Sequence, residues 1–133
     1  MGRFKILVVD DEPIVLDSCR LILEAEDYVV ELVPSVDEAV DALKKSDFGL
    51  LLVDVKMPVR DGMSLMREVK ENWPEMPIVV MSGYPTRETV AAVAEIGASK
   101  FISKPFTPDE LCEIVRQFTQ KEESNGNKKG SGN

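Results

Sequence analysis

The sequence predicts an α/β fold, a doubly wound parallel sheet of five strands with helices on both faces in a three-layer sandwich. Three observations carry this prediction. Short apolar runs alternate five times with segments of helical periodicity, the pattern of parallel sheets with right-handed crossovers. Residues 50–53, LLLV, form an unbroken apolar run, as expected of a strand buried on both faces. Polar side chains follow the strong runs directly, at the edge where open α/β sheets bind ligands.

The first part of the chain supplies two strands and two helices. Residues 4–9, FKILVV, predict a strand, and Pro13 suits the first turn of the helix that follows. Residues 28–33 predict a second strand. Ser35 and Glu38 have the spacing of a capping box, so a helix with an apolar stripe is expected to begin there.

The middle of the chain repeats the alternation. After the strand at residues 50–53, the segment 62–72 has helical periodicity and ends before two prolines. Residues 78–81, IVVM, predict a fourth strand. The helix that begins at about Pro85 is expected to stop at Gly97, because glycine commonly follows a helix C-terminus.

The last strand is expected at residues 100–103, KFIS. Thr107 then provides a helix N-cap, with Pro108 at the first helical position and Glu110 three residues after the cap. Apolar residues at helical spacing make the segment that follows an amphipathic helix. The alternation of strand and helix is then complete.

The composition is that of one globular domain with a polar tail. Of the 133 residues, 44% are hydrophobic and 30% are charged. No apolar run approaches the roughly 20 residues of a membrane-spanning helix, and the N-terminus lacks the features of a signal peptide, so we expect a cytoplasmic protein. The end of the chain is rich in Gly, Asn and Ser. We therefore expect a domain over residues 1–121 and a disordered tail or linker over residues 122–133.

Charge and missing residue types exclude several functions. The chain has no histidine, which removes Ser/His/Asp and Cys/His catalysis and histidine-ligated zinc. A net charge of −8 argues against direct nucleic-acid binding, which needs a basic face. Cys19 and Cys112 lie among apolar residues of helical segments and are expected to be buried thiols.

Polar residues follow four of the five predicted strands. The first strand ends in Asp10 and Asp11, the third in Asp54, the fourth in Ser82 and the fifth in Lys104. Because the carboxyl ends of parallel strands lie on one edge of a sheet, we expect these side chains to share a pocket. Each residue alone has an ordinary explanation as a cap, a turn residue or an exposed charge. Together they predict a functional site.

These side chains predict magnesium-dependent phosphoryl transfer. Clustered carboxylates raise one another's pKa unless a cation lies among them, and oxygen ligands without histidine or cysteine favour Mg²⁺. Mg²⁺ and Lys104 would neutralise a phosphoryl group, and the Ser82 hydroxyl would donate a hydrogen bond to it. Asp54 lies on a central strand between the other groups and is the expected nucleophile, which would form an aspartyl phosphate.

The sequence resembles the receiver domains of two-component response regulators, including the chemotaxis-regulator-like ones, over about residues 3–120. The matching residues are Asp10-Asp11, Asp54 with Met57-Pro58 and Asp61-Gly62 behind it, Ser82-Gly83 and Lys104-Pro105. The resemblance implies a flavodoxin-like fold of five strands in the order 2-1-3-4-5 and five helices. It also implies a cis peptide bond before Pro105.

The resemblance assigns a role to each site residue. Asp54 would be the phosphoacceptor, taking its phosphoryl group from a sensor histidine kinase or a phosphotransfer protein. Asp11 and the main-chain carbonyl of Lys56 would bind Mg²⁺ directly together with Asp54, and Asp10 would hold the ion mostly through water. Such a domain is a signalling module rather than an enzyme, and it catalyses only its own phosphorylation and dephosphorylation.

The resemblance also implies a conformational switch. Ser82 and Lys104 would contact the phosphoryl oxygens, and Ser82 would be drawn toward them, vacating space into which the Phe101 ring turns inward. The surface of the fourth helix, fifth strand and fifth helix would thereby change. Lys56 and Tyr84 occupy positions that tune the attack of water on the phosphoryl group, and we expect slow spontaneous dephosphorylation.

Besides the phosphodonor, the expected partners are an output domain or an effector protein, or a second copy of the chain bound through the surface of the fourth helix, fifth strand and fifth helix. The protein is expected to contact neither nucleic acid nor a membrane directly. The alternative is a degenerate receiver that acts as a phosphorylation-independent protein-binding module. A phosphatase of the haloacid dehalogenase type would need a second aspartate two residues after the nucleophile, which neither Asp10 nor Asp54 has. A flavodoxin-like cofactor binder would need a phosphate cradle where the first loop is acidic.

Overall fold

The computed structural model describes residues 4–56, 61–83 and 85–131, with side chains as far as residue 119. The elements in chain order are β1 (Lys5–Val9), α1 (Pro13–Ala25), β2 (Val29–Val33), α2 (Val36–Lys45), β3 (Leu50–Asp54), α3 (Gly62–Asn72), β4 (Ile78–Ser82), α4 (Arg87–Ile96), β5 (Lys100–Ser103) and α5 (Pro108–Ser131). All neighbouring strands are parallel, in the order β2-β1-β3-β4-β5. The predicted fold class and strand order are confirmed.

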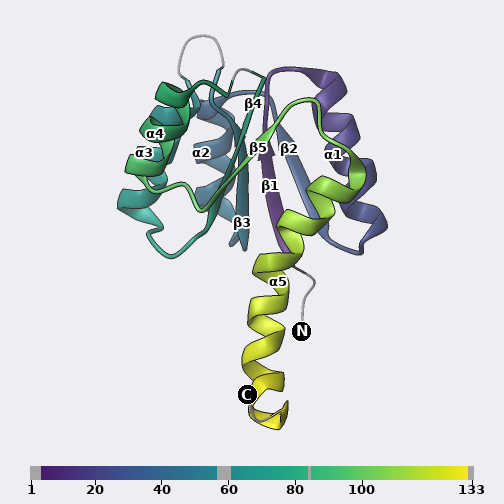
Figure 1. Ribbon diagram of the computed structural model, residues 1–133. Coiled ribbons are helices and arrows are strands. Elements are labelled where there is room, and N and C mark those ends of the chain that lie inside the picture. Colours follow the sequence, from purple (N-terminus) through teal and green to yellow (C-terminus); the bar gives the residue numbers. More distant parts are fainter. Residues whose placement is uncertain (1–3, 57–60, 84, 132–133) are drawn as a thin grey trace.

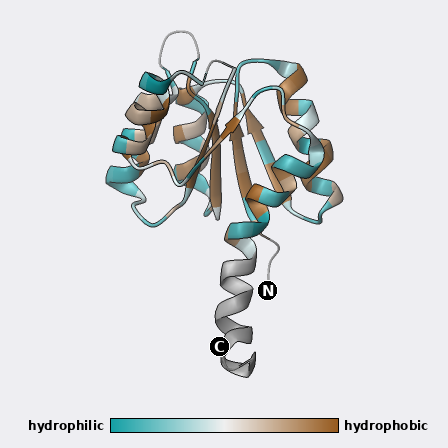
Figure 2. Cartoon of the chain, viewed as in Figure 1, coloured by the Kyte–Doolittle hydropathy of each residue, from teal (hydrophilic) through white to brown (hydrophobic). Residues whose placement is uncertain are grey.

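The sheet lies between two layers of helices (Figure 1). On one face, Ile6 and Val8 of β1 pack in a core with residues of α1 and α5. On the other face, Leu7 and Val9 pack in a core with residues of α2, α3 and α4. Successive side chains of a strand point to opposite faces, so one apolar run supplies both cores. Figure 2 shows the result, a hydrophobic sheet between helices in which hydrophobic and hydrophilic residues alternate.

The two most buried strands end in polar residues. Every residue of β3 and of β4 is buried, which explains why their sequences are apolar without alternation. Both strands extend one residue beyond the predicted runs, because backbone pairing does not depend on the polarity of the side chain. Asp54 pairs with Met81, and Ser82 pairs with Ser103. The sheet itself therefore fixes the backbone of both residues.

Helix ends follow the predicted capping chemistry. Thr107 Oγ1 accepts a hydrogen bond from Glu110 N at 3.1 Å, and Glu110 Oε1 accepts one from Thr107 N at 2.8 Å. α4 begins later than predicted, because the Thr86 hydroxyl caps it by accepting from Thr89 N at 3.1 Å. Gly97 ends α4 with a φ of 122°, a conformation that favours glycine.

The C-terminal segment differs from the expectation. α5 continues to Ser131 and extends past the body of the sandwich (Figure 1), although composition predicts disorder from residue 122. The division into a domain over residues 1–121 and a linker stays a prediction. No helix among the described residues combines the length and apolar character needed to cross a bilayer.

Candidate functional site

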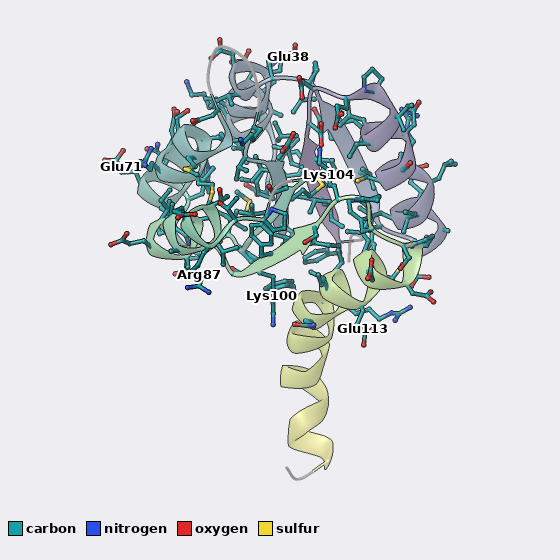
Figure 3. All side chains as sticks on the ribbon, turned by 45° about the horizontal axis from the view of Figure 1, so that its top comes forward. Glu38, Glu71, Arg87, Lys100, Lys104 and Glu113 are labelled. Atoms are coloured by element: carbon teal, nitrogen blue, oxygen red, sulfur yellow. The ribbon has the colours of Figure 1, made fainter. Side chains whose placement is uncertain are left out.

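The Lys104 side chain lies among three carboxylates at the carboxyl edge of the sheet. Its Nζ atom is 3.0 Å from Asp10 Oδ2, 2.8 Å from Glu12 Oε1 and 3.3 Å from Asp54 Oδ2. Asp10 is fully buried and Asp54 nearly so, whereas 60% of the Glu12 side chain is exposed. Figure 3 shows Lys104 over the middle of this edge, while Lys100, at the start of β5, lies at the periphery. The cluster joins residues up to 94 positions apart in the sequence.

Backbone hydrogen bonds orient the two buried carboxylates. Asp10 follows β1, and its Oδ1 atom accepts a hydrogen bond from Glu12 N at 2.9 Å. Asp54 ends β3, and its Oδ1 atom accepts from Lys56 N at 3.1 Å. In each case one carboxylate oxygen is fixed by the chain two residues further on, in the manner of an Asx turn. The other oxygen, Oδ2, faces the ammonium of Lys104.

A backbone hydrogen bond to β4 fixes the position of Lys104. Its backbone N donates to Ser82 O at 2.8 Å, which ties the residue after β5 to the end of β4. Ser82 is fully buried at that end. The peptide bond between Lys104 and Pro105 is cis, as predicted. The ends of β3, β4 and β5 therefore bring Asp54, Ser82 and Lys104 to one edge.

Burial governs the ionisation of the cluster. It raises the pKa of Asp54; repulsion from Asp10 adds to the rise, and the hydrogen bond from Lys56 N and the ammonium of Lys104 oppose it. Burial likewise raises the pKa of Asp10. Burial alone would lower the pKa of Lys104, but its bonds to Glu12 and Asp10 raise it above the usual value. Lys104 therefore stays charged. Its single positive charge neutralises the negative charges of Asp10 and Asp54 only in part.

The donor set fits a hard divalent cation. Carboxylate oxygens of Asp10, Glu12 and Asp54 lie within 4.8 Å of one another. Three carboxylates and one ammonium leave two negative charges uncompensated. Oxygen ligands of this kind suit Mg²⁺, which takes one or two carboxylates and keeps other positions for water and phosphate oxygens. A bound Mg²⁺ would neutralise phosphate oxygens at this edge.

Comparison with known families identifies the protein family to which this site belongs. The family model of the response regulator receiver domain matches residues 6–116, which include every residue of the cluster. The chain is a response regulator receiver domain. The predicted family is thereby confirmed.

Individual relatives agree with this assignment. The receiver is 40% identical over 116 residues to the hydrogenase transcriptional regulatory protein HoxA of Cupriavidus necator, and covers 24% of that protein. It is 33% identical to an uncharacterized 14.6 kDa protein of Leptolyngbya boryana, of which it covers 92%. A CheY-like receiver domain from Methanospirillum hungatei has a similar structure, with a TM-score of 0.87 at 31% identity over 93% of this chain and 99% of that one. The receiver thus spans about a quarter of HoxA.

A cleft of about 780 Å³ opens over the receiver's acidic cluster. Its polar end is lined by Asp11, Glu12, Asp54 and Lys104, and its other wall is apolar. That wall includes Ile14 and Leu21 of α1, whose exposed fractions of 79% and 71% are unusual for large hydrophobic residues, together with Phe106. The site therefore has an acidic floor and an apolar flank.

The structure adds one residue to the predicted cluster. Asp10, Asp54 and Lys104 come together as predicted, but the third carboxylate of the group is that of Glu12, and Asp11 is exposed. Glu12 is not among the site residues predicted from the sequence. Its charge and its place two residues after Asp10 were the available signals. Asp11 lines the same cleft, and its role as a metal ligand stays a prediction.

The remaining predicted residues lie at different depths. Phe101 is half-buried and packs against the core on the α2, α3 and α4 face, with Val80 opposite it in β4. Lys56 is exposed and contributes its backbone N to Asp54. Tyr84, with the Met57-Pro58 pair, lies outside the described residues. Cys19 is buried as predicted, and burial raises the pKa of its thiol to about 12, so it is no nucleophile at neutral pH.

The raised pKa of Asp10 has a consequence for stability. A folded-state pKa above the ordinary value of 3.8 means that the folded protein binds more protons than the unfolded chain, so the free energy of unfolding falls as pH rises through that window. In the metal-free receiver, Asp10→Asn should therefore raise the free energy of unfolding at neutral pH by about 1 kcal/mol. Urea unfolding at neutral and mildly acidic pH measures this, and the gain should shrink in acid. Asp17→Asn, at an exposed site on α1, is the control. A less stable Asp10→Asn protein would mean that the ion pair with Lys104 outweighs the cost of burial.

Proposed function

We propose that this receiver takes a phosphoryl group from a phosphohistidine donor onto Asp54, with the help of Mg²⁺, and thereby switches a protein-interaction surface. The observation that carries the proposal is the position of Asp54. Its carboxylate ends a fully buried central strand, opens on the cleft and lies 3.3 Å from the ammonium of Lys104. A nucleophile, a cation and an oxygen donor set for Mg²⁺ thus meet at one edge.

The transfer requires little of the protein beyond orientation and charge. An Asp54 carboxylate oxygen forms a bond to phosphorus while the bond from phosphorus to the donor's ring nitrogen breaks. The electron pair of that bond returns to the ring nitrogen, and the donor leaves as neutral imidazole when its other ring nitrogen is protonated. Lys104 neutralises charge on the phosphoryl oxygens, and Ser82, at the end of the neighbouring strand, supplies a hydroxyl. Asp11, Asp54 and the carbonyl of Lys56 would hold Mg²⁺, with Asp10 behind them.

The apolar wall of the cleft supports a protein as the phosphodonor. Ile14 and Leu21 are exposed on the α1 flank of the acidic cluster, and exposed hydrophobic patches beside a reactive group commonly mark a protein-binding site. A histidine kinase or phosphotransfer protein that docks there would bring its histidine over Asp54. Both kinds of protein act in the cytoplasm, where we place this receiver.

The response to phosphorylation is proposed to pass through Ser82 and Phe101. Ser82 is buried at the end of β4, and Phe101 lies on the adjacent strand with its ring half-buried. A shift of Ser82 toward the phosphoryl group would change the packing of that ring and the surface of α4, β5 and α5. An output domain, an effector or a second receiver would bind this surface. Lys56 and Tyr84 would slow the attack of water on the phosphoryl group.

Intact mass tests the proposal. The receiver is incubated with a small phosphodonor such as acetyl phosphate, with and without Mg²⁺, and compared with Asp54→Asn. We expect a gain of one phosphoryl group that needs Mg²⁺ and that is absent from the variant. The same gain in Asp54→Asn would remove Asp54 as the acceptor. No gain in the parent under either condition would favour a receiver that binds its partners without phosphorylation.

A further inference from the structure

Glu12 belongs to the carboxylate group that suits a divalent cation, but the proposed transfer uses Asp11, Asp54 and the carbonyl of Lys56 as the ligands and gives Glu12 no role of its own. It accepts the shortest of the three bonds from Lys104, 2.8 Å against 3.0 Å for Asp10 and 3.3 Å for Asp54. An ammonium has three N–H donors, so these contacts use all of them. A phosphoryl oxygen can therefore receive a hydrogen bond from Lys104 only if one carboxylate gives it up.

The exposure of the three carboxylates identifies the one that yields. Asp10 is fully buried and Asp54 nearly so, and withdrawing the ammonium from either would leave a buried charge without its partner. The side chain of Glu12 is 60% exposed, so water can replace the ammonium there at small cost. Glu12 is the carboxylate that separates most easily from Lys104.

The position of Glu12 supports a role directed at Lys104. Glu12 is the N-cap residue of α1, where an acidic side chain could bond to the free backbone N–H groups of the helix. Its side chain makes no such capping bond and is instead bonded to Lys104 Nζ. The backbone N of Glu12 bonds to Asp10 Oδ1, which places the start of the side chain beside the cluster.

We propose that Glu12 is a positioning residue, which holds Lys104 in the unphosphorylated receiver and releases it to the incoming phosphoryl group. The proposal rests on the proposed function and adds a competition to it. Glu12 and the phosphoryl group compete for one ammonium, so Glu12 weakens the binding of phosphoryl-like ligands and favours the resting state. Glu12 acts through Lys104 and touches neither the donor nor the reacting atoms.

Binding of beryllium trifluoride tests this competition, because the compound with Mg²⁺ mimics an aspartyl phosphate without being turned over. Calorimetric titration of Glu12→Gln should give a dissociation constant about threefold to fivefold lower than that of the parent, the effect of a partly exposed ion pair. Glu24→Gln removes the same charge from an exposed site on α1 and should leave the constant unchanged. Glutamine has nearly the same size as glutamate, and the bond from the backbone N of residue 12 to Asp10 Oδ1 is kept.

A double-mutant cycle shows whether Glu12 acts through Lys104. In a Lys104→Met background, Glu12→Gln should no longer change the affinity. Unchanged or weaker binding by Glu12→Gln in the parent background would overturn the proposal. So would an effect of equal size in the Lys104→Met background, because Glu12 would then act on the metal or the anion itself.

A second measurement needs neither Mg²⁺ nor phosphorylation. Nitrogen-detected NMR of the Lys104 ammonium in the metal-free receiver should show slow proton exchange in the parent and faster exchange in Glu12→Gln. Equal exchange rates would overturn the holding role. A parent that binds no beryllium trifluoride would contradict the proposed phosphoryl transfer, whereas this NMR comparison would still decide whether Glu12 holds Lys104.

Discussion

Replacing Lys104 with methionine is expected to slow the phosphorylation of Asp54 by about a hundredfold, the usual effect of removing one charge-stabilising donor from a preorganised site. Lys104 is the cation of the buried cluster, and it lies within 3.3 Å of both Asp10 and Asp54. Methionine has a similar length but no charge. The rate of mass gain with a small phosphodonor and Mg²⁺ measures the effect.

Lys100→Met is the matched control for this variant. Lys100 lies on β5, the strand that precedes Lys104, but is exposed at the periphery of the molecule (Figure 3), and its replacement should leave the rate unchanged. Circular dichroism should first establish that each variant is folded, because Lys104→Met leaves two buried carboxylates without their ammonium. A rate for folded Lys104→Met within a factor of two of the parent would remove Lys104 from the transfer.

Gly62→Ala is expected to lower the free energy of unfolding by about 2 kcal/mol, because α3 begins against the end of β3 with no room for a side chain. A Cβ at Gly62 would meet Asp54 O and would come within 2.8 Å of Val55 Cα. Gly62 N also bonds to Val55 O at 3.1 Å, so the helix cannot easily move away. The backbone of the phosphoacceptor would have to shift, and the rate of phosphorylation should fall together with the stability. Urea unfolding and the mass-gain rate measure the two effects.

Gly83→Ala is the control for stability. A Cβ at Gly83 meets no atom within 4 Å, so alanine should be neutral there or stabilise by up to about 1 kcal/mol through the unfolded chain. Equal stabilities for Gly62→Ala and Gly83→Ala would show that the start of α3 adjusts freely, and that the contact does not position Asp54.

The sequence predicts most of this fold because the signals are local and strong. The apolar runs of β3 and β4 can be buried only in the middle of a sheet, and residues such as Thr107 and Gly97 mark helix ends by capping chemistry. The convergence of Asp10, Asp54 and Lys104 follows from parallel topology, which places the strand ends on one edge.

Two features of the structure could not be predicted from the sequence, each for a physical reason. Asp11 and Glu12 are adjacent acids, and which of them turns toward Lys104 depends on the backbone angles of a short loop, φ −98° and ψ 114° at Glu12. No local pattern encodes that choice. The length of α5 is the second feature, because the polar segment after Gln120 has no apolar stripe that would indicate whether it is helical.

The most direct test of the phosphoryl chemistry is to locate the group on the chain. Borohydride reduces an aspartyl phosphate to homoserine, and peptide mapping by mass spectrometry then identifies the modified position. With a phosphodonor and Mg²⁺, transfer to Asp54 predicts homoserine at position 54 and at no other acidic residue. Homoserine at position 10 or 11, or at none, would contradict the assignment of Asp54 as the phosphoacceptor.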